Sequence, residues 1–237
     1  LGFQLVHEPS TNDVYVAGYN TGIEVFSDSF TSNPTSTWAG ILIKYNENGS
    51  LVWGQNIAGN TCPLGQNCGV YFNNIVLHPN GGVIVGGNFL IDYKSSLGGG
   101  SGKGSWDVLV LRYDVNGTLI WQFEAGSPED DRIQSLSVNP KVEVQFGGNH
   151  LDDMQFPFFT LNTSNSNTRY DGFIAQLDPD GDFQWALSIG GADNDTVGAL
   201  IAKDDGTLIA GGDFSGTVMF GNTPRSATDQ DIFVWMF

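Results

Sequence analysis

The chain has few basic residues, almost no cysteine and no long apolar run. Only 9 of its 237 residues are lysine or arginine, against 26 aspartates and glutamates, so the formal charge is −17. This excess of negative charge repels nucleic-acid phosphates and anionic lipid headgroups. No apolar run approaches the ~20 residues that a membrane-spanning helix needs. The sequence therefore predicts neither nucleic-acid binding nor membrane insertion, and it favours a cation or a basic partner.

Helix-forming residues are also sparse, whereas glycine is abundant at 32 residues and Asn, Ser and Thr are plentiful. This composition is typical of short strands that are joined by tight turns. The sequence begins with Leu1 rather than methionine and shows no signal peptide. We therefore expect either that a leader has been removed or that this is a piece of a longer chain.

The two cysteines, Cys62 and Cys68, lie in the loop sequence CPLGQNC. Such a close pair predicts a small disulfide ring in an oxidising compartment. A zinc half-site is the alternative, but it needs a second pair of ligands that is not evident nearby. Four N-glycosylation sequons favour the same extracellular, cell-surface location, and their acceptors are Asn48, Asn116, Asn162 and Asn194.

Two sequence blocks recur along the chain. The first is an apolar run, a turn, a glycine and a tryptophan, and its tryptophans are Trp53, Trp121 and Trp185. Their period is 68 and then 64 residues, and a further copy begins at 231–237. The second block ends in a glycine at positions 18, 87, 148 and 212. Such regular self-similarity indicates a repeat architecture.

Short β-rich runs with this period predict an all-β fold, namely a β-propeller of four-stranded antiparallel blades. A blade buries its faces only by stacking on a neighbour. The strand assignment gives three complete blades plus most of a fourth, so we expect part of a larger propeller. A four-bladed ring that lacks one outer strand is the alternative. The predicted repeat units are 1–59, 70–127, 132–191 and 197–237.

The stretch GGADNDTVGALIAKDDGTLIAGGDF (190–214), preceded by DGFIAQLDPDGDFQW (171–185), resembles the SBBP-type β-propeller repeat of secreted and cell-surface proteins. The resemblance covers nearly the whole chain and is strongest in the third and fourth units. The D-x-G turn is missing at 139–144, and the cysteine loop replaces the GG…ND segment of the first unit. The resemblance implies a propeller in an extracellular setting, and it implies no activity.

Asp178-Pro179-Asp180-Gly181 looks like a calcium loop. The equivalent segments 46–49 and 114–117 have Asn-Gly where this segment has Asp-Gly, and their other residues differ. Either pair between two apolar runs is a hairpin signal, because both central residues need φ > 0. We therefore expect a turn, with a weak calcium site at Asp178, Asp180 and Asp182 as the alternative.

A second acidic cluster recurs, because Asp193 and Asp195 align with Glu129 and Asp131. These carboxylates either cap a turn by accepting backbone N–H groups or bind a cation at one rim of the propeller. Calcium is the one cofactor that the acidic residues suggest.

Aromatic residues recur at two positions. The tryptophans of the first block are typical of packing between blades. The second set precedes the third strand and indicates either packing or a sugar-stacking platform. It consists of Trp38, Trp106 and Tyr170.

The connections between second and third strands differ most between units. The connection at 151–169 carries the apolar sequence MQFPFF, with Phe156, Phe158 and Phe159. Because binding residues often lie on long, variable loops, we expect a contact surface here. A loop folded over the outer edge of the blade is the alternative.

Catalytic motifs are scarce. The three histidines fall at different repeat positions, and no G-x-S-x-G, H-E-x-x-H or phosphate-binding loop occurs. The sequence therefore predicts a non-enzymatic extracellular module that is structural, adhesive or protein-binding and that uses its loops for protein partners or self-assembly. The alternative is a lectin or a carbohydrate-active enzyme with an acidic, aromatic-lined face that binds glycans. A quinoprotein-like enzyme is a third hypothesis.

Overall fold

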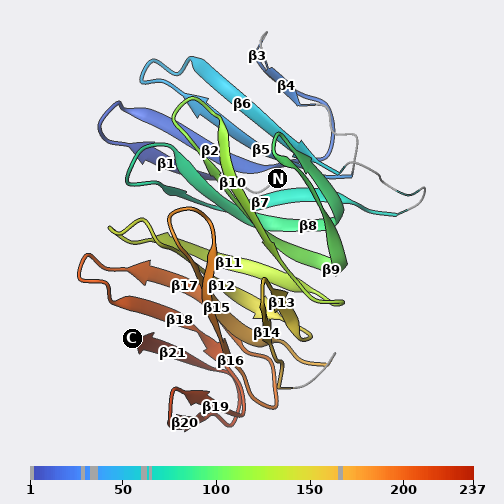
Figure 1. Ribbon diagram of the computed structural model, residues 1–237, viewed down its shortest axis with the longest axis vertical. Coiled ribbons are helices and arrows are strands. Elements are labelled where there is room, and N and C mark those ends of the chain that lie inside the picture. The colour runs from blue at the N-terminus through green and yellow to red at the C-terminus, as the bar shows by residue number, and fades with distance from the viewer. Residues whose placement is uncertain (1–2, 28–29, 33–36, 60–62, 64–65, 165–167) are drawn as a thin grey trace. The chain divides into compact units, whose positions relative to one another are not determined.

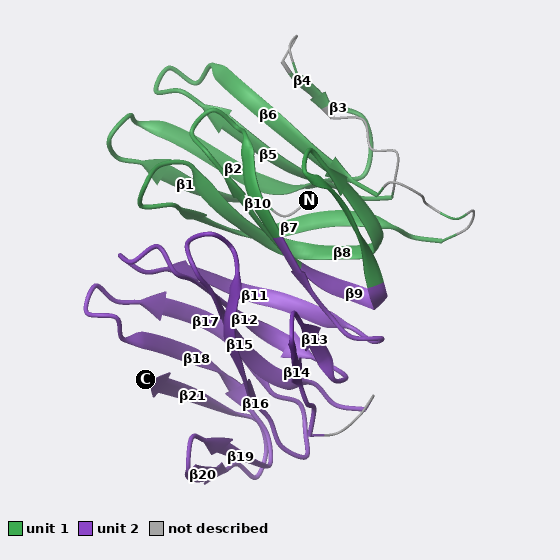
Figure 2. Cartoon of the chain, viewed as in Figure 1, with its two compact units in different colours: residues 1–102, 109–122 green, residues 103–108, 123–237 purple. Residues whose placement is uncertain are grey.

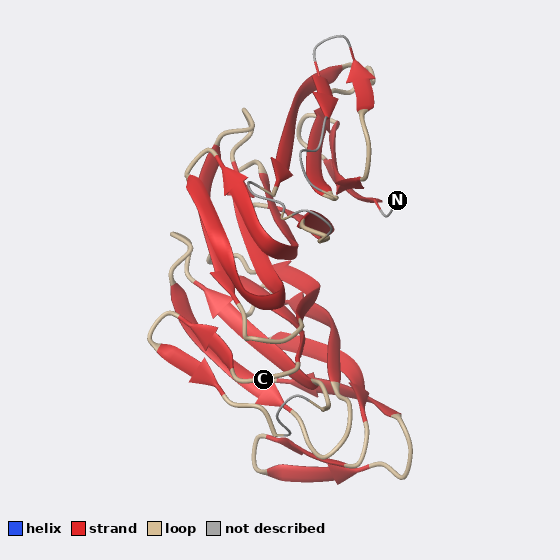
Figure 3. Ribbon diagram, turned by 90° about the vertical axis from the view of Figure 1, so that its right-hand side faces the viewer, coloured by secondary structure: helices blue, strands red, loops and turns tan. Residues whose placement is uncertain are grey.

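The computed structural model describes residues 3–27, 30–32, 37–59, 63, 66–164 and 168–237 (Figure 1). The regular structure of these residues is β-strand throughout, which confirms the all-β prediction (Figure 3). None of them forms a helix that is long and apolar enough to cross a membrane. The chain divides into two compact units, residues 1–102 with 109–122 and residues 103–108 with 123–237 (Figure 2).

The main sheet of the first unit contains two sets of four strands. Its strands are β1 (Phe3–Glu8), β2 (Asp13–Asn20), β5 (Ala39–Tyr45), β6 (Leu51–Ala58), β7 (Gly69–Leu77), β8 (Val83–Ser95), β9 (Gly98–Tyr113) and β10 (Leu119–Ala125). The first four pair antiparallel in chain order. One bridge between Ala58 and Lys94 joins the two sets. Residues 103–108 in the middle of β9 and residues 123–125 at the end of β10 belong to the second unit.

The second unit contains a four-stranded and a three-stranded antiparallel sheet. The first is β11 (Asp131–Val138), β12 (Val144–His150), β15 (Asp171–Leu177) and β16 (Phe183–Ile189). The second is β17 (Thr196–Ala202), β18 (Leu208–Phe214) and β21 (Asp231–Met236). Each of the four predicted repeat units thus contains one set of antiparallel strands.

The variable connections between second and third strands form hairpins of their own. They are β3 (Glu24–Ser27) with β4 (Phe30–Ser32), β13 (Met154–Phe156) with β14 (Phe159–Leu161), and β19 (Thr217–Phe220) with β20 (Thr223–Ser226). In the second repeat, β8 and β9 themselves continue as long strands. The segments expected to be loops therefore hold strand pairs beside the main sheets.

Each unit has an apolar core between its two sets of strands. In the first unit, Tyr15 and Leu42 pack with Phe72, Val85 and Leu109 from the second set. In the second unit, Ile174 packs with Val197, Leu200 and Phe233. Alternation along each strand sends every second side chain into this core. A single set of strands could not bury these residues, so neighbouring repeats stabilise each other.

The turn after β15 forms where the sequence predicts it, but with different geometry. The Asp178 N–H donates to the Asp182 carbonyl at 2.9 Å, and the Gly181 N–H donates to the Asp178 carbonyl at 3.1 Å. Only Gly181 has positive φ, at 86°, so the expectation that both central residues need φ > 0 is wrong. A type I turn followed by one left-handed residue explains both the single positive φ at Gly181 and the register shift between β15 and β16.

The segment at 139–143 makes the same turn without a glycine. The Asn139 side-chain oxygen accepts the N–H groups of Lys141 and Glu143, each at 3.0 Å. Val142 takes the place of the glycine at φ 67°, which is unfavourable for a β-branched residue. Side-chain capping therefore preserves the turn although the D-x-G pattern is missing from this segment.

Trp53 shows why the first tryptophan set recurs. Its Nε1–H donates to the Val115 carbonyl at 3.0 Å, in the turn of the next repeat. Its ring lies over Gly117, where a Cβ atom would come within 2.8 Å of it. Trp53 thus fixes the neighbouring turn, as the packing interpretation requires.

Candidate functional site

The hairpin β13–β14 presents an aromatic residue at its tip. Phe156 pairs with Phe159, so the loop consists of Pro157 and Phe158 alone. Proline presets the backbone of the first loop position, and the second position normally holds glycine because it needs positive φ. Phe158 occupies that position at φ 61°. The MQFPFF sequence therefore places a phenylalanine in a conformation that costs about 1–2 kcal/mol for a residue with a Cβ.

The Phe158 side chain is fully exposed, with 109% of its reference surface in water. An apolar ring held in solvent by an unfavourable backbone conformation gives nothing to the core. Such strained residues concentrate at binding and catalytic sites. Of the predicted contact residues, Phe158 therefore has the geometry of a binding residue.

The other two aromatic residues of the hairpin anchor it to the sheet. Phe156 is buried, and its ring centroid lies 4.8 Å from that of Phe183 at the start of β16. Phe159 stacks on the same ring at 5.8 Å. The Gln155 N–H donates to the Gly126 carbonyl at 2.8 Å. The hairpin thus folds over the edge of its sheet and also holds Phe158 in a fixed, exposed position.

A second cluster surrounds the ion pair between Arg132 and Asp130, whose atoms Nη2 and Oδ2 are 2.9 Å apart. The Arg132 guanidinium lies 5.8 Å from the centre of the Trp106 ring. The Tyr170 hydroxyl donates to Asp130 Oδ2 at 3.3 Å. Burial raises the pKa of Asp130, but hydrogen bonds from Ser105 and Arg132 outweigh it and leave the pKa below its ordinary value.

The structure thus brings Trp106 and Tyr170 to one carboxylate. Trp38, the third member of the predicted platform, belongs to the first unit and is half-buried there. Its backbone N–H donates to the Cys68 carbonyl at 3.2 Å. We conclude that only two of the three predicted platform residues share a cluster within one unit.

Buried aspartates cap the turns at the start of the first strands. Asp195 accepts the Gly191 N–H at 2.9 Å and the Ser215 N–H at 3.0 Å. Asp131 accepts the Ser127 N–H, and both carboxyl groups are fully buried. Burial raises the pKa of Asp131 to about 8 and that of Asp195 to about 7. These hydrogen bonds from backbone N–H groups are the ones expected if the acidic residues cap turns.

The remaining acidic candidates lie nearer the surface. Asp193 is half-exposed and lies 3.9 Å from Arg169, and Glu129 donates its N–H to the Ser127 hydroxyl. In the predicted calcium loop, Asp178 Oδ1 accepts the N–H groups of Asp180 and Asp182 at 3.0 and 2.9 Å. Asp178 therefore caps its own turn.

No three His, Cys, Asp or Glu side chains are grouped to hold a metal ion in the part of the chain that the structure describes. We therefore expect calcium and a chelator to leave the thermal unfolding midpoint unchanged. Differential scanning calorimetry at neutral pH checks this, with magnesium as the control cation. A midpoint that rises with calcium alone would instead support the predicted calcium site.

The four sequon asparagines, Asn48, Asn116, Asn162 and Asn194, are all exposed. Asn194 also accepts the Tyr170 backbone N–H through its side-chain oxygen at 3.0 Å. Cys68 is fully buried, whereas Cys62 lies outside the described residues. The disulfide and the glycans therefore remain predictions.

Sequence reasoning missed further buried carboxyl groups, among them Asp107 and Asp171. Asp107 accepts the Lys103 N–H at 2.8 Å, and burial raises its pKa to about 7. Asp171 accepts the Thr163 hydroxyl at 3.1 Å. Asp107 directly follows Trp106, and Asp171 directly follows Tyr170. This shared repeat position is the sequence signal that could have identified both aspartates.

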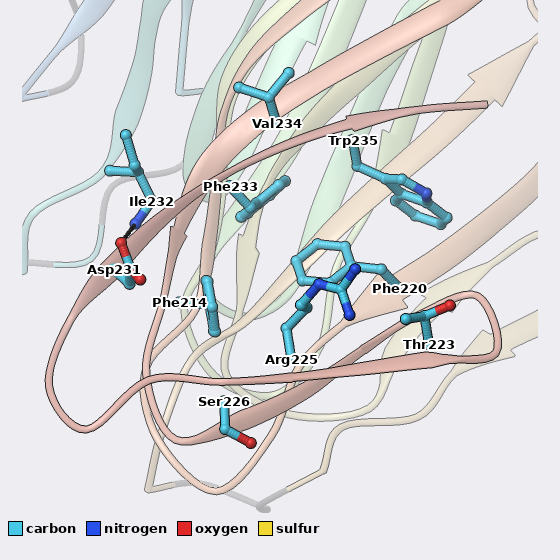
Figure 4. A pocket seen from close by; sticks show the side chains of 10 residues that line it. All are labelled: Phe214, Phe220, Thr223, Arg225, Ser226, Asp231, Ile232, Phe233, Val234 and Trp235. Atoms are coloured by element: carbon cyan, nitrogen blue, oxygen red, sulfur yellow. Dashed lines mark hydrogen bonds between the residues drawn. The ribbon is translucent and has the colours of Figure 1, made fainter.

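A pocket of about 420 Å³ lies between hairpin β19–β20 and strand β21 (Figure 4). Phe220, Phe233 and Trp235 line it together with Arg225. The Phe220 ring lies 4.9 Å from Phe233 and 5.6 Å from Trp235. β21 pairs only with β18 among the described strands, whereas the equivalent strand β15 pairs with both β12 and β16. The pocket thus adjoins the edge at which a fourth strand lies in the preceding sheet.

No protein family model matches the chain. Regulatory protein FlaEY of Caulobacter vibrioides is 31% identical to it over 144 residues, which cover 59% of this chain. The matched region spans 15% of the length of that relative.

Proposed function

We propose that this chain is a β-propeller module of the SBBP type, located outside the cell, which acts without catalysis as a structural, adhesive or protein-binding element. The propeller is supported by four successive sets of antiparallel strands, with cores between neighbouring sets in each unit. Recurrent contacts such as that of Trp53 with the next turn also support it. The match to a small part of a much longer relative is consistent with a module.

The observation that carries the binding role is the fully exposed Phe158 on an anchored hairpin. An aromatic residue held rigidly in solvent loses little conformational entropy when a partner covers it. The surrounding negative charge of the chain favours a basic protein partner over an anionic surface. We therefore assign the contact surface to the tip of β13–β14.

Replacing Phe158 with aspartate is expected to abolish partner binding while leaving the fold intact, because the side chain contributes nothing to the core. The measurement is surface binding to an array of extracellular proteins, with the wild type and Phe158→Asp compared side by side. Ile120→Asp, at another exposed apolar strand position, is the matched control. Equal binding by wild type and Phe158→Asp would remove the hairpin from the proposal.

The cluster of Trp106, Tyr170, Asp130 and Arg132 favours a second candidate function, glycan binding. Aromatic rings beside a charged pair can stack on a sugar and bond its hydroxyl groups. A glycan array with a hydrolysis readout separates the candidates. Retention of a glycan that is lost in Tyr170→Ala would favour the lectin, and turnover of any sugar would overturn the non-enzymatic role.

A further inference from the structure

A further pocket, of about 490 Å³, lies in the first compact unit between the end of β6 and the tip of the β8–β9 hairpin. This volume falls within the range of ~300–1,000 Å³ that is typical of small-molecule sites. Most of the described side chains that line it are polar. They are Gln55, Asn56, Lys94, Ser95, Ser96 and Tyr113.

The hairpin tip reaches β6 because β8 changes its partner strand. As far as Leu90, β8 pairs with β7, whereas Lys94 pairs with Ala58 of β6. Ile91, between these two pairings, has a φ of 72°, which is unfavourable for a β-branched residue. Such strained residues concentrate at functional sites. The tip is thus held against β6 at a local cost in backbone energy.

The same arrangement of strand and hairpin occurs once more, within the second unit. Ala58 and Gly126 each lie five residues after a recurring tryptophan. Ala58 forms a bridge with Lys94, and Gly126 forms one with Gln155. After Lys94 and after Gln155, one further strand residue leads into a two-residue hairpin loop. Lys94 and Gln155 are therefore equivalent positions.

The second unit fills this place with two aromatic rings. Phe156, directly after Gln155, lies with its ring centroid 6.3 Å from that of Phe123, and both residues are buried. The first unit has Ser95 and Gln55 at the equivalent positions. Since the strands on both sides of the pocket are present, the opening results from these two smaller or polar side chains and not from a missing strand.

Two buried polar atoms of the lining residues lack a hydrogen-bond partner among the described residues. They are the Tyr113 hydroxyl and the Asn56 side-chain oxygen. Burial raises the pKa of Tyr113 far above its ordinary value, so the hydroxyl stays protonated and can donate. A buried polar atom without a partner is costly, and a bound water, ion or ligand is its usual explanation. The lining thus offers one donor and one acceptor to a bound molecule.

Lys94 determines the charge of the pocket. It is the one charged side chain among the described residues that line the pocket, and it forms no ion pair with any of the described residues. The carboxylates behind the net charge of −17 are spread along the chain, and physiological salt screens charges beyond ~8 Å. The pocket therefore favours an anion, and its amide and hydroxyl groups favour an anion that carries hydroxyl groups.

We propose that this pocket binds a uronic acid, a sugar that carries a carboxylate. The carboxylate lies at the Lys94 ammonium group, one sugar hydroxyl donates to Asn56, and the Tyr113 hydroxyl donates to another sugar oxygen. Ile57, which also lines the pocket, contacts the C–H groups of the sugar ring. The site belongs to the first unit, whereas Phe158 and the cluster around Tyr170 belong to the second. This inference therefore goes beyond the proposed function.

The test is a saturation-transfer difference NMR titration of the chain with sodium glucuronate and with glucose. The wild type is expected to bind glucuronate about tenfold more tightly, because only glucuronate makes a charge-assisted contact with Lys94. Lys94→Gln is expected to weaken glucuronate binding about tenfold and to leave glucose binding nearly unchanged. Lys141→Gln, at an exposed lysine of another repeat, is the matched control and should bind both sugars like the wild type.

The double replacement Gln55→Phe with Ser95→Phe introduces the two aromatic rings that fill the equivalent place in the second unit. It is expected to abolish the binding of both sugars. Circular dichroism of every variant checks that the strands remain. Titration with a trisaccharide of galacturonate separates two sources of the ligand: binding of the trisaccharide assigns the pocket to a glycan residue, and binding of glucuronate alone assigns it to the free acid.

Absence of glucuronate binding by the wild type would overturn the proposal, and so would glucose binding of equal strength. Glucuronate binding that Lys94→Gln or the double replacement leaves unchanged would do the same. Phe158→Asp and Tyr170→Ala are expected to bind glucuronate like the wild type, so a failure of the proposed function at those residues is distinguishable. Sugar turnover would overturn the proposed non-enzymatic function and leave binding at this pocket untouched.

Discussion

Replacement of Gly212 by alanine is expected to destabilise the second compact unit by about 2–4 kcal/mol. A Cβ atom at Gly212 would lie 1.9 Å from the Thr196 carbonyl oxygen and 2.8 Å from the Phe233 ring. The carbonyl belongs to the backbone of the paired strand, so it cannot move aside without breaking the β17–β18 pairing. Overpacking against backbone is therefore relieved only by distorting the sheet.

The same contact recurs at the equivalent glycines. A Cβ atom would lie 2.0 Å from the Tyr71 carbonyl at Gly87, and 1.8 Å from the Arg132 carbonyl at Gly148. In all three repeats the first strand has a register shift beside this point. The bulge brings the first strand so close to the second that only glycine fits.

Gly211 offers a matched control one residue away. Its nearest neighbour to a new Cβ atom would be 3.7 Å distant, which is ordinary van der Waals contact. Gly211→Ala is therefore expected to be neutral or to stabilise by roughly 0.5 kcal/mol, since alanine loses less entropy in a strand. Urea unfolding monitored by tryptophan fluorescence measures both variants. Equal midpoints for the two would show that the bulge relaxes freely.

The sequence repeat allowed much of this fold to be predicted. The four sets of antiparallel strands form where apolar alternation and turn glycines recur along the sequence. The turn at 139–143 was not recognised, since Val142 occupies the position that glycine holds in the equivalent turns. Its capping residue Asn139 is identifiable only once the register is known.

The candidate site could be predicted only in part. MQFPFF was identified as a contact segment from its apolar composition, but its three phenylalanines looked equivalent. Whether each ring is buried depends on Phe183, which is distant in the sequence and stacks on Phe156 and Phe159. The positive φ of Phe158 follows from the two-residue loop, whose length depends on strand pairing. Tertiary contacts of this kind leave no local pattern.

Unfolding of the second unit is expected to require less free energy as the pH rises from about 6.5 to 8. Burial raises the pKa of three of its carboxyl groups, to about 8 for Asp131 and about 7 for Asp107 and Asp195. Unfolded aspartate has a pKa near ~3.9, so throughout this interval the folded chain binds more protons than the unfolded chain. Stability is therefore fully present at low pH and is lost as the pH passes the folded pKa values.

Above pH ~6.5 the pH dependence of stability reports these carboxyl groups rather than His150. Burial lowers the pKa of His150, so it favours unfolding only at more acidic pH, where the unfolded ring becomes charged. Since one pKa unit corresponds to ~1.4 kcal/mol, the three carboxyl groups together are expected to remove about 1–3 kcal/mol between pH 6.5 and 8. The negative charge of Asp107 also raises the pKa of Asp131.

Asp131→Asn tests the assignment, because an amide keeps the acceptor for the Ser127 N–H and carries no charge. The variant is expected to be more stable than the wild type at pH 8, and this advantage is expected to be smaller at pH 6 by about 1–2 kcal/mol. Asp180→Asn, in an exposed turn, is the control and should follow the wild type at both pH values. Urea unfolding at the two pH values measures the difference. If Asp131→Asn loses as much stability between pH 6 and pH 8 as the wild type does, the ionisation of Asp131 does not destabilise the fold. The pH dependence would then be assigned to other groups.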